Sequence, residues 1–134
     1  SGFGRLLVAV YAVFAVSAGA RAGVQLATDF AAAPLAYLLS AFAAAVYLLA
    51  TVALTRPGRT ARLVAAAAIS VEMVGVLAVG AASVVAPEAF PEATVWSRFG
   101  AGYGYVPLVL PAVGLWWLWR TRSGARRASA SPAA

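Results

Sequence analysis

The sequence contains no cysteine, no histidine and no lysine, and it has only four acidic residues. The absence of thiols and imidazoles excludes disulfide bonds, thiol redox chemistry, soft metal sites and histidine-based catalysis. The two carboxylates that lie close together, Glu88 and Glu92, fit a solvated loop better than an active site, and no nucleophile–base pair is visible. We therefore expect no metal, no cofactor and no catalytic residue, and we favour a protein that catalyses no reaction.

Charge of either sign is also scarce. Charged residues make up 10% of the 134 positions and hydrophobic residues 63%, whereas a soluble domain carries about 25% charged residues. Runs of about 20 apolar residues, the length that crosses the hydrocarbon core of a bilayer, recur along the chain. The composition therefore predicts an integral membrane protein.

We predict an all-α fold, a four-helix transmembrane bundle that forms a single domain over residues 1–122. The helices are expected at about residues 6–27, 34–54, 63–85 and 103–119, with a polar loop over 87–98. Residues 123–134 form an Arg/Ser/Ala-rich tail in which we expect disorder beyond about Gly124. The first apolar run also fits a cleavable secretion signal, but we expect it to be a retained membrane helix.

The arginines predict the orientation. Four spans place both termini on one side, together with eight arginines, while the other side receives only Arg98 if Arg21 is left aside as intramembrane. By the positive-inside rule the termini are cytoplasmic, in a bacterial plasma membrane. The cytoplasmic arginines are expected to contact anionic lipid headgroups rather than nucleic acid. Any homo-oligomer, or larger membrane complex, is expected to be parallel.

The first expected helix carries a charge where a membrane helix normally has none. Ser17, Arg21 and Gln25 are spaced four residues apart and form one polar stripe. Gly19 and Gly23 lie nearly opposite, in a spacing that lets another helix approach closely. We therefore expect the glycine face to be packed and the polar stripe to face a cavity, the rest of the bundle or a partner.

The third expected helix carries the second intramembrane charge, Glu72, with Gly75 on nearly the same face as a packing position. An isolated carboxylate there is costly and marks function or a partner. Arg21 is the obvious mate, although the two backbones differ in depth by about 10 Å. Alternatively, Arg21 reaches outward to acidic loop residues or lipid phosphate, and Glu72 is protonated or bonded to a hydroxyl of the second helix.

The second expected helix places several hydroxyls on one stripe. Tyr37, Ser40 and Tyr47 could line a polar cavity with Arg21 and Glu72. The competing interpretation, which we favour, is that they bond to neighbouring helices or to backbone carbonyls.

The approach to the fourth expected helix is rich in aromatic residues, glycine and proline. Trp96, Tyr103 and Tyr105 fit an interfacial aromatic belt, and the two tyrosines are also candidate ligand contacts. Pro107 and Pro111 are four residues apart, which favours a hinge with carbonyls freed one turn upstream.

Three stretches, "SAGARAGVQLAT", "PLAYLLSA" and "VWSRFGAGYGYVPLVLPAVGLWWL", resemble a group of small four-span integral membrane proteins from actinobacteria. The resemblance covers about residues 5–120 and implies the topology and the kind of host. It implies no activity and no functional residue.

Two functions compete at this point. The favoured one is an accessory or scaffold subunit of a membrane assembly, because helix 1 is expected to pack on both faces and catalytic side chains are missing. The alternative is a small transporter or amphiphile-binding protein in which Arg21 recognises an anionic group and Glu72 couples to protons or cations.

Overall fold

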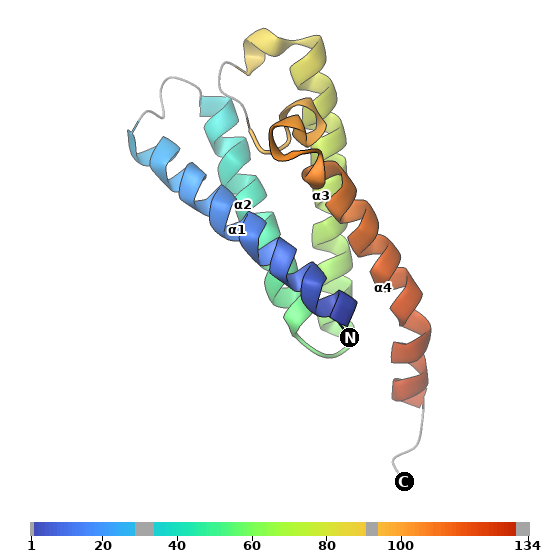
Figure 1. The fold of residues 1–134 in the computed structure, drawn as a ribbon. Helices are drawn as coiled ribbons and strands as arrows, with labels where there is room; N and C mark the ends of the chain where they lie inside the picture. The colour runs from blue at the N-terminus through green and yellow to red at the C-terminus, as the bar shows by residue number, and fades with distance from the viewer. Residues whose placement is uncertain (1, 29–33, 91–93, 131–134) are drawn as a thin grey trace.

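The structure is a computed structural model that describes residues 2–28, 34–90 and 94–130. All regular secondary structure in these residues is helical (Figure 1). The long helices are α1 (Gly2–Thr28), α2 (Pro34–Thr55), α3 (Arg59–Val85) and α4 (Val106–Ala130), and the short ones are the 3-10 helices η2 (Pro87–Ala89) and η3 (Ser97–Tyr103). Helix α2 begins with a proline, which suits the first helical position because its missing N–H needs no partner there. The all-α prediction is confirmed for these residues.

Three helices, α1, α2 and α3, are long and apolar enough to cross a membrane. The number rises to four if η3 and α4, which meet at an angle of 99°, count as one bent span. By length and composition the chain is thus consistent with a multi-pass membrane protein.

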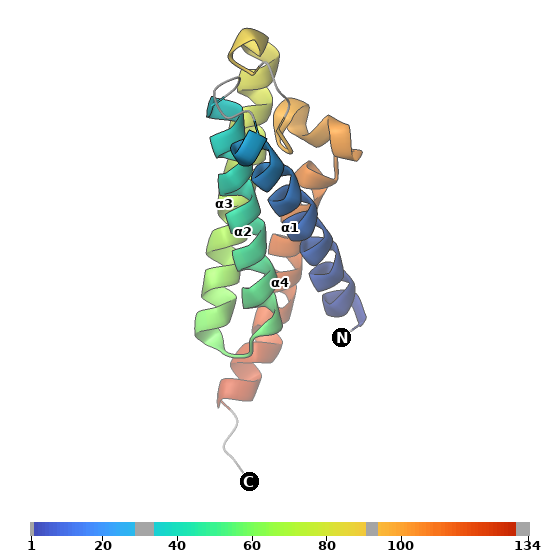
Figure 2. The same ribbon diagram turned by 90° about the vertical axis from the view of Figure 1, so that its left-hand side faces the viewer.

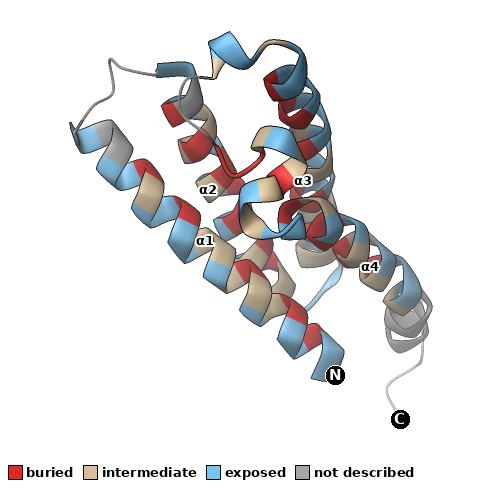
Figure 3. Cartoon of the chain, turned by 45° about the horizontal axis from the view of Figure 1, so that its top comes forward, coloured by how far each residue is buried: buried red, intermediate tan, exposed pale blue. Residues whose placement is uncertain are grey.

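Large apolar side chains point outward from these helices. Val16, Val74 and Leu48 are 72%, 66% and 57% exposed, while the interior holds aromatic residues and small ones such as Ala43 and Ala65 (Figure 3). Small buried residues let helices approach closely, and an apolar exterior is what lipid requires. The burial pattern therefore agrees with the composition.

The helices pack in chain order, α1 on α2, α2 on α3 and α3 on α4 (Figures 1 and 2). The N-terminus, the α2–α3 turn and the end of α4 lie at one end of the molecule, which we call the terminal end, and η2 and η3 lie at the other, which we call the loop end. Helices α1 and α4 also meet through side chains, because the rings of Phe3 and Trp116 stack edge to face with centroids 6.1 Å apart.

The fourth helix differs from its prediction at both ends. It begins at Val106 rather than Tyr103, because Gly104 and Tyr105 both have positive φ, at 63° and 62°, and turn the chain sharply. It continues to Ala130, so the disorder expected beyond Gly124 is wrong as far as that residue. Residues 131–134 lie outside the described chain.

The chain bends before the two prolines for which we expected a hinge, and the hinge itself stays a prediction. Pro107 lies in the first turn of α4, where a helix needs no N–H from it, and Pro111 lies inside the helix. Both rings are fully buried. The change of direction comes before them, at Gly104–Tyr105, and Gly100 is pressed against Pro107 so closely that a Cβ there would lie 2.8 Å from the ring.

Candidate functional site

The polar loop predicted over 87–98 is exposed at Pro87–Ala89 and at Arg98, but its residues 94–96 enter the protein. Thr94, Val95 and Trp96 are only 4%, 4% and 1% exposed. Their polar backbone is satisfied locally, because the Thr94 hydroxyl accepts from the Ser97 N–H (3.1 Å) and the Ser97 hydroxyl accepts from the Thr94 N–H (2.8 Å). This reciprocal capping holds a tight turn with Trp96 at its centre.

Trp96 is a core residue rather than part of an aromatic belt. Its ring fills a notch at Gly75 of α3, where a Cβ would lie 2.6 Å from the Trp96 ring. Its indole N–H donates to the Tyr47 hydroxyl of α2 over 3.2 Å. Gly75 is thus a packing position as predicted, but its partner is an inserted side chain and not a helix.

The next residues adopt a strained backbone. Arg98 and Phe99 have positive φ, at 52° and 61°, which non-glycine residues rarely adopt. Two contacts with α3 hold them, because the Arg98 N–H donates to the Ser83 hydroxyl over 2.8 Å and the Phe99 ring lies against Gly80. Such strain is commonly stored at functional sites.

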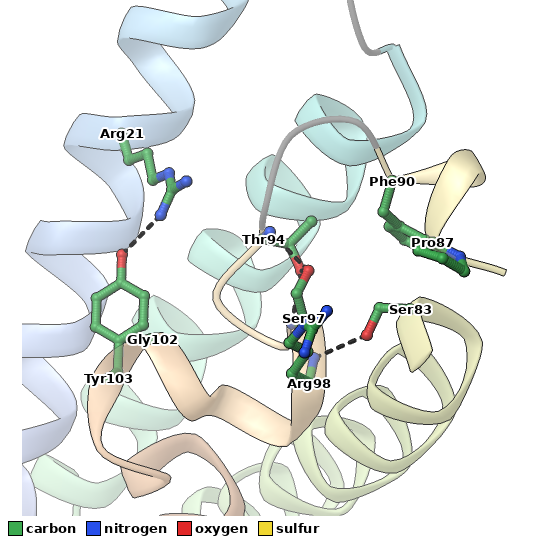
Figure 4. A pocket seen from close by; sticks show the side chains of 9 residues that line it. All are labelled: Arg21, Ser83, Pro87, Phe90, Thr94, Ser97, Arg98, Gly102 and Tyr103. Atoms are coloured by element: carbon green, nitrogen blue, oxygen red, sulfur yellow. Dashed lines mark hydrogen bonds between the residues drawn. The ribbon is translucent and has the colours of Figure 1, made fainter. Parts of the chain in front are cut away.

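A cavity of about 600 Å³, which we call the vestibule, opens at the loop end between α1, α3 and the 94–103 segment (Figure 4). Two arginines from distant parts of the chain, Arg21 and Arg98, line it. Its other polar lining residues are Ser83, Thr94, Ser97 and Tyr103, and none of the lining residues that the structure describes is acidic.

Arg21 is half-buried and extends from α1 toward η3. Its Nη1 donates to the Tyr103 hydroxyl over 3.1 Å (Figure 4). The Tyr103 ring packs against Phe14 of α1, with centroids 5.8 Å apart. The guanidinium is therefore held over the cavity by an aromatic support, in a position suited to an anionic group.

Glu72 does not pair with Arg21. Its side chain is completely buried, and neither carboxylate oxygen has a hydrogen-bond partner among the described residues. Two phenols interact with the carboxyl, namely those of Tyr11 of α1 and Tyr47 of α2. Tyr11 was not among the residues that the sequence pointed to.

The remaining candidates are dispersed. Ser17 is exposed, and the side chain of Gln25 lies outside the described chain. Tyr37, Ser40 and Tyr47 are buried in the core and do not line the vestibule, so the less favoured alternative, a cavity of α2 hydroxyls with Arg21 and Glu72, is not formed by the described residues. Tyr105 is 52% exposed at the start of α4.

Within the described chain no element packs on the glycine face of helix 1, so the close packing expected there stays a prediction. Gly19 and Gly23 are exposed, and a Cβ at either would meet no atom within 4 Å. Helix α1 packs instead through Leu7, Tyr11 and Ala18, which are nearly inaccessible.

A second depression, a groove of about 250 Å³, lies between α1 and α4. Its lining is almost wholly apolar and includes Leu6 and Val10 of α1 and Val109 and Val113 of α4. Gly104 lines the groove, and the preceding residues Gly102 and Tyr103 line the vestibule, so one short segment borders both.

Sequence reasoning found Arg21 and Tyr103 but missed most of the vestibule. The sequence did not single out Ser83, and it indicated Arg98 only as an orientation signal. The one readable sign was the Thr94–Ser97 spacing, which matches that of a capping box, although serine stands where glutamate or glutamine is usual.

Comparison of the chain with known protein families, functionally characterised proteins and solved structures gives no match. The resemblance to small actinobacterial membrane proteins stays a prediction, and the functional argument depends on the site itself.

Proposed function

We propose that the protein binds an anionic amphiphile, with the charged group in the vestibule and the apolar chain in the groove between α1 and α4. The observation that carries the proposal is that Arg21 and Arg98, from distant parts of the chain, both line one cavity. Guanidinium groups bind carboxylate and phosphate through paired, charge-assisted hydrogen bonds. The Ser97 and Tyr103 hydroxyls add polar contacts at the same cavity.

The groove supports an amphiphile over a free anion. Along α1, the distance from Arg21 down to Val10 is eleven residues, about 16 Å at the helical rise per residue. A chain leaving the vestibule past Gly102–Gly104 would enter a lining with little polar surface. The charged and apolar parts of one ligand thus each have a matching surface.

The proposal includes an orientation. We infer four spans in a bacterial plasma membrane, with η3 and α4 forming one broken span and both termini cytoplasmic. The arginines of the terminal end support this, since eight of the ten belong to that side of the chain. The vestibule then opens outward, and its ligand comes from the outer leaflet or the external medium.

The accessory or scaffold subunit predicted from the sequence stays a prediction. The glycine face of helix 1 on which it relied meets no neighbour within the described chain.

Binding to the purified protein in a neutral detergent tests the proposal. Decyl phosphate is expected to bind more tightly than decyl maltoside, which lacks the charge, and more tightly than inorganic phosphate, which lacks the chain. Arg21→Gln and Arg98→Gln should each weaken decyl phosphate binding about tenfold or more, since a hydrogen bond to a charged group contributes about 1.5–3 kcal/mol.

Arg59→Gln is the matched control, because Arg59 is exposed at the start of α3, at the opposite end of the molecule. Equal binding of decyl phosphate and decyl maltoside, or arginine variants that bind like the control, would contradict the proposal. Equal binding of decyl phosphate and inorganic phosphate would leave the vestibule as an anion site and remove the groove from it.

A further inference from the structure

The middle of α3 contains a carboxyl group that the vestibule does not use. Glu72 is 0% exposed, and both of its oxygens lack a hydrogen-bond partner in the described residues. Ionised carboxylates without a cation are very costly in such surroundings, and buried polar groups are normally satisfied. A glutamate kept in this position therefore calls for a specific reason.

Two phenol groups from different helices interact with this carboxyl. Tyr11 approaches from α1 and Tyr47 from α2, with ring centroids 6.2 Å apart, and both interact with Glu72. The Tyr11 hydroxyl is itself buried and without a partner among the described residues. It lies against Gly114 of α4, where a Cβ would be 3.2 Å from the phenol oxygen, so α4 offers no polar side chain at that point.

The Tyr47 hydroxyl is oriented by Trp96. The indole nitrogen is only a donor, so in the 3.2 Å bond Tyr47 must accept, and its own hydrogen remains available for another acceptor. Glu72 is a neighbouring group that can use this hydrogen. The Tyr47 ring is also one aromatic layer from the vestibule, since Phe14 packs on both Tyr47 (5.7 Å) and Tyr103 (5.8 Å).

We propose that Glu72 is a proton-binding site whose proton exchanges through the hydroxyls of Tyr11 and Tyr47. In one exchange the carboxyl O–H bond breaks, a phenol oxygen accepts that proton, and the phenol passes its own hydrogen on to a water molecule that enters between the helices. The net change is one proton released and one carboxylate formed, which then accepts hydrogen bonds from the two phenols. Intramembrane carboxylates are typical components of proton relays.

The titratable groups that bear on this exchange are few. Tyr11 faces Glu72 from α1 and Tyr47 from α2, and Tyr103 of η3 lies beyond Tyr47 and interacts with it. A phenol holds its proton more tightly than a carboxylic acid, so the carboxyl is the group that changes charge. The inference does not depend on the anion proposal, because it concerns different atoms.

Infrared spectroscopy of the reconstituted protein tests the inference directly. The double variant Glu88→Gln/Glu92→Gln leaves Glu72 as the only glutamate, so ¹³C-glutamate labels this carboxyl alone. We expect a carbonyl band of a protonated carboxylic acid that shifts in D₂O and is lost as the pH is raised. Added decyl phosphate is not needed, so failure here and failure of the anion proposal are distinguishable.

Two further variants in the same background test the route. Tyr11→Phe and Tyr47→Phe should slow the D₂O shift, whereas Tyr105→Phe, which removes an exposed phenol at the start of α4, should not. A band that never shifts in D₂O would overturn the inference, and so would a carboxylate band at every pH. Exchange equally fast in all three tyrosine variants would also overturn it.

Discussion

A single missing side chain sets the position of the re-entrant segment. Gly75 is a helical residue with no unusual φ, so glycine is needed here because it has no side chain, and not because of its backbone flexibility. The Trp96 ring occupies the volume that a Cβ would need, and the indole is rigid and hydrogen-bonded to Tyr47. Because α2, α3 and the 94–103 segment meet at this ring, one added methyl group at Gly75 should disturb the packing of all three.

We expect Gly75→Ala to lower the free energy of unfolding by about 1–3 kcal/mol, the usual cost of overpacking a filled core. The Trp96 ring must move out of its notch, so tryptophan fluorescence should also shift toward that of a more polar environment. Gly23→Ala is the matched control, because its Cβ meets no atom within 4 Å and alanine favours a helix. Thermal unfolding in detergent, followed by circular dichroism, compares the two. Equal stability of the two variants would refute the notch.

At the scale of elements, the sequence predicted the positions of the long helices, because these depend on the length and apolarity of each run. Helices α1, α2 and α3 were placed to within about four residues, because a membrane span needs about 20 apolar residues and turns interrupt such runs clearly. The buried 94–103 segment was missed for a physical reason. Its hydroxyls and charges look solvated in sequence, but they bond to one another and to Ser83, a partner that only the fold brings near.

The contact between α3 and α4 at the terminal end depends on one arginine that sequence alone assigned to orientation. The Arg62 guanidinium donates to the Leu118 carbonyl oxygen over 2.6 Å and to the Thr121 hydroxyl over 2.8 Å. Thr121 in turn donates to the Trp117 carbonyl over 2.9 Å. These bonds fasten the last apolar turn of α4 to the first turn of α3.

We expect Arg62→Ala to destabilise the protein by about 1–3 kcal/mol, the range for a lost hydrogen bond to a charged group. Amide hydrogen exchange should accelerate in α4 around Leu118–Thr121 before it does so in α1 or α2. Arg59→Ala, one turn earlier and exposed, should leave the exchange of α4 unchanged. Uniform acceleration in all helices, or none, would be inconsistent with a local clamp.

At the scale of the whole molecule, the candidate site was predicted only in part. Charge within apolar runs singled out Arg21 and Glu72, and the predicted difference in depth argued against a direct pair, which the described residues do not form. The side chains that these two residues meet could not be predicted, because Tyr103, which accepts from Arg21, is 82 positions away in the chain, and Tyr11, which interacts with Glu72, is 61 positions away. The periodicity of a sequence predicts which residues share one face of a helix, but it does not predict which other element packs on that face.

The orientation of the molecule in the membrane can be tested with single cysteines, because the sequence contains none of its own. Gly102→Cys places a thiol at the loop end, where the residue is exposed and a Cβ meets nothing within 4 Å. Thr60→Cys places one in the exposed first turn of α3 at the terminal end. If the arginine-rich end is cytoplasmic, a membrane-impermeant maleimide applied to intact cells should label Gly102→Cys and spare Thr60→Cys. After lysis both should react, which shows that the spared thiol is accessible. Labelling of Thr60→Cys in intact cells would place the terminal end outside and turn the vestibule toward the cytoplasm, so its anionic ligand would then have to come from within the cell.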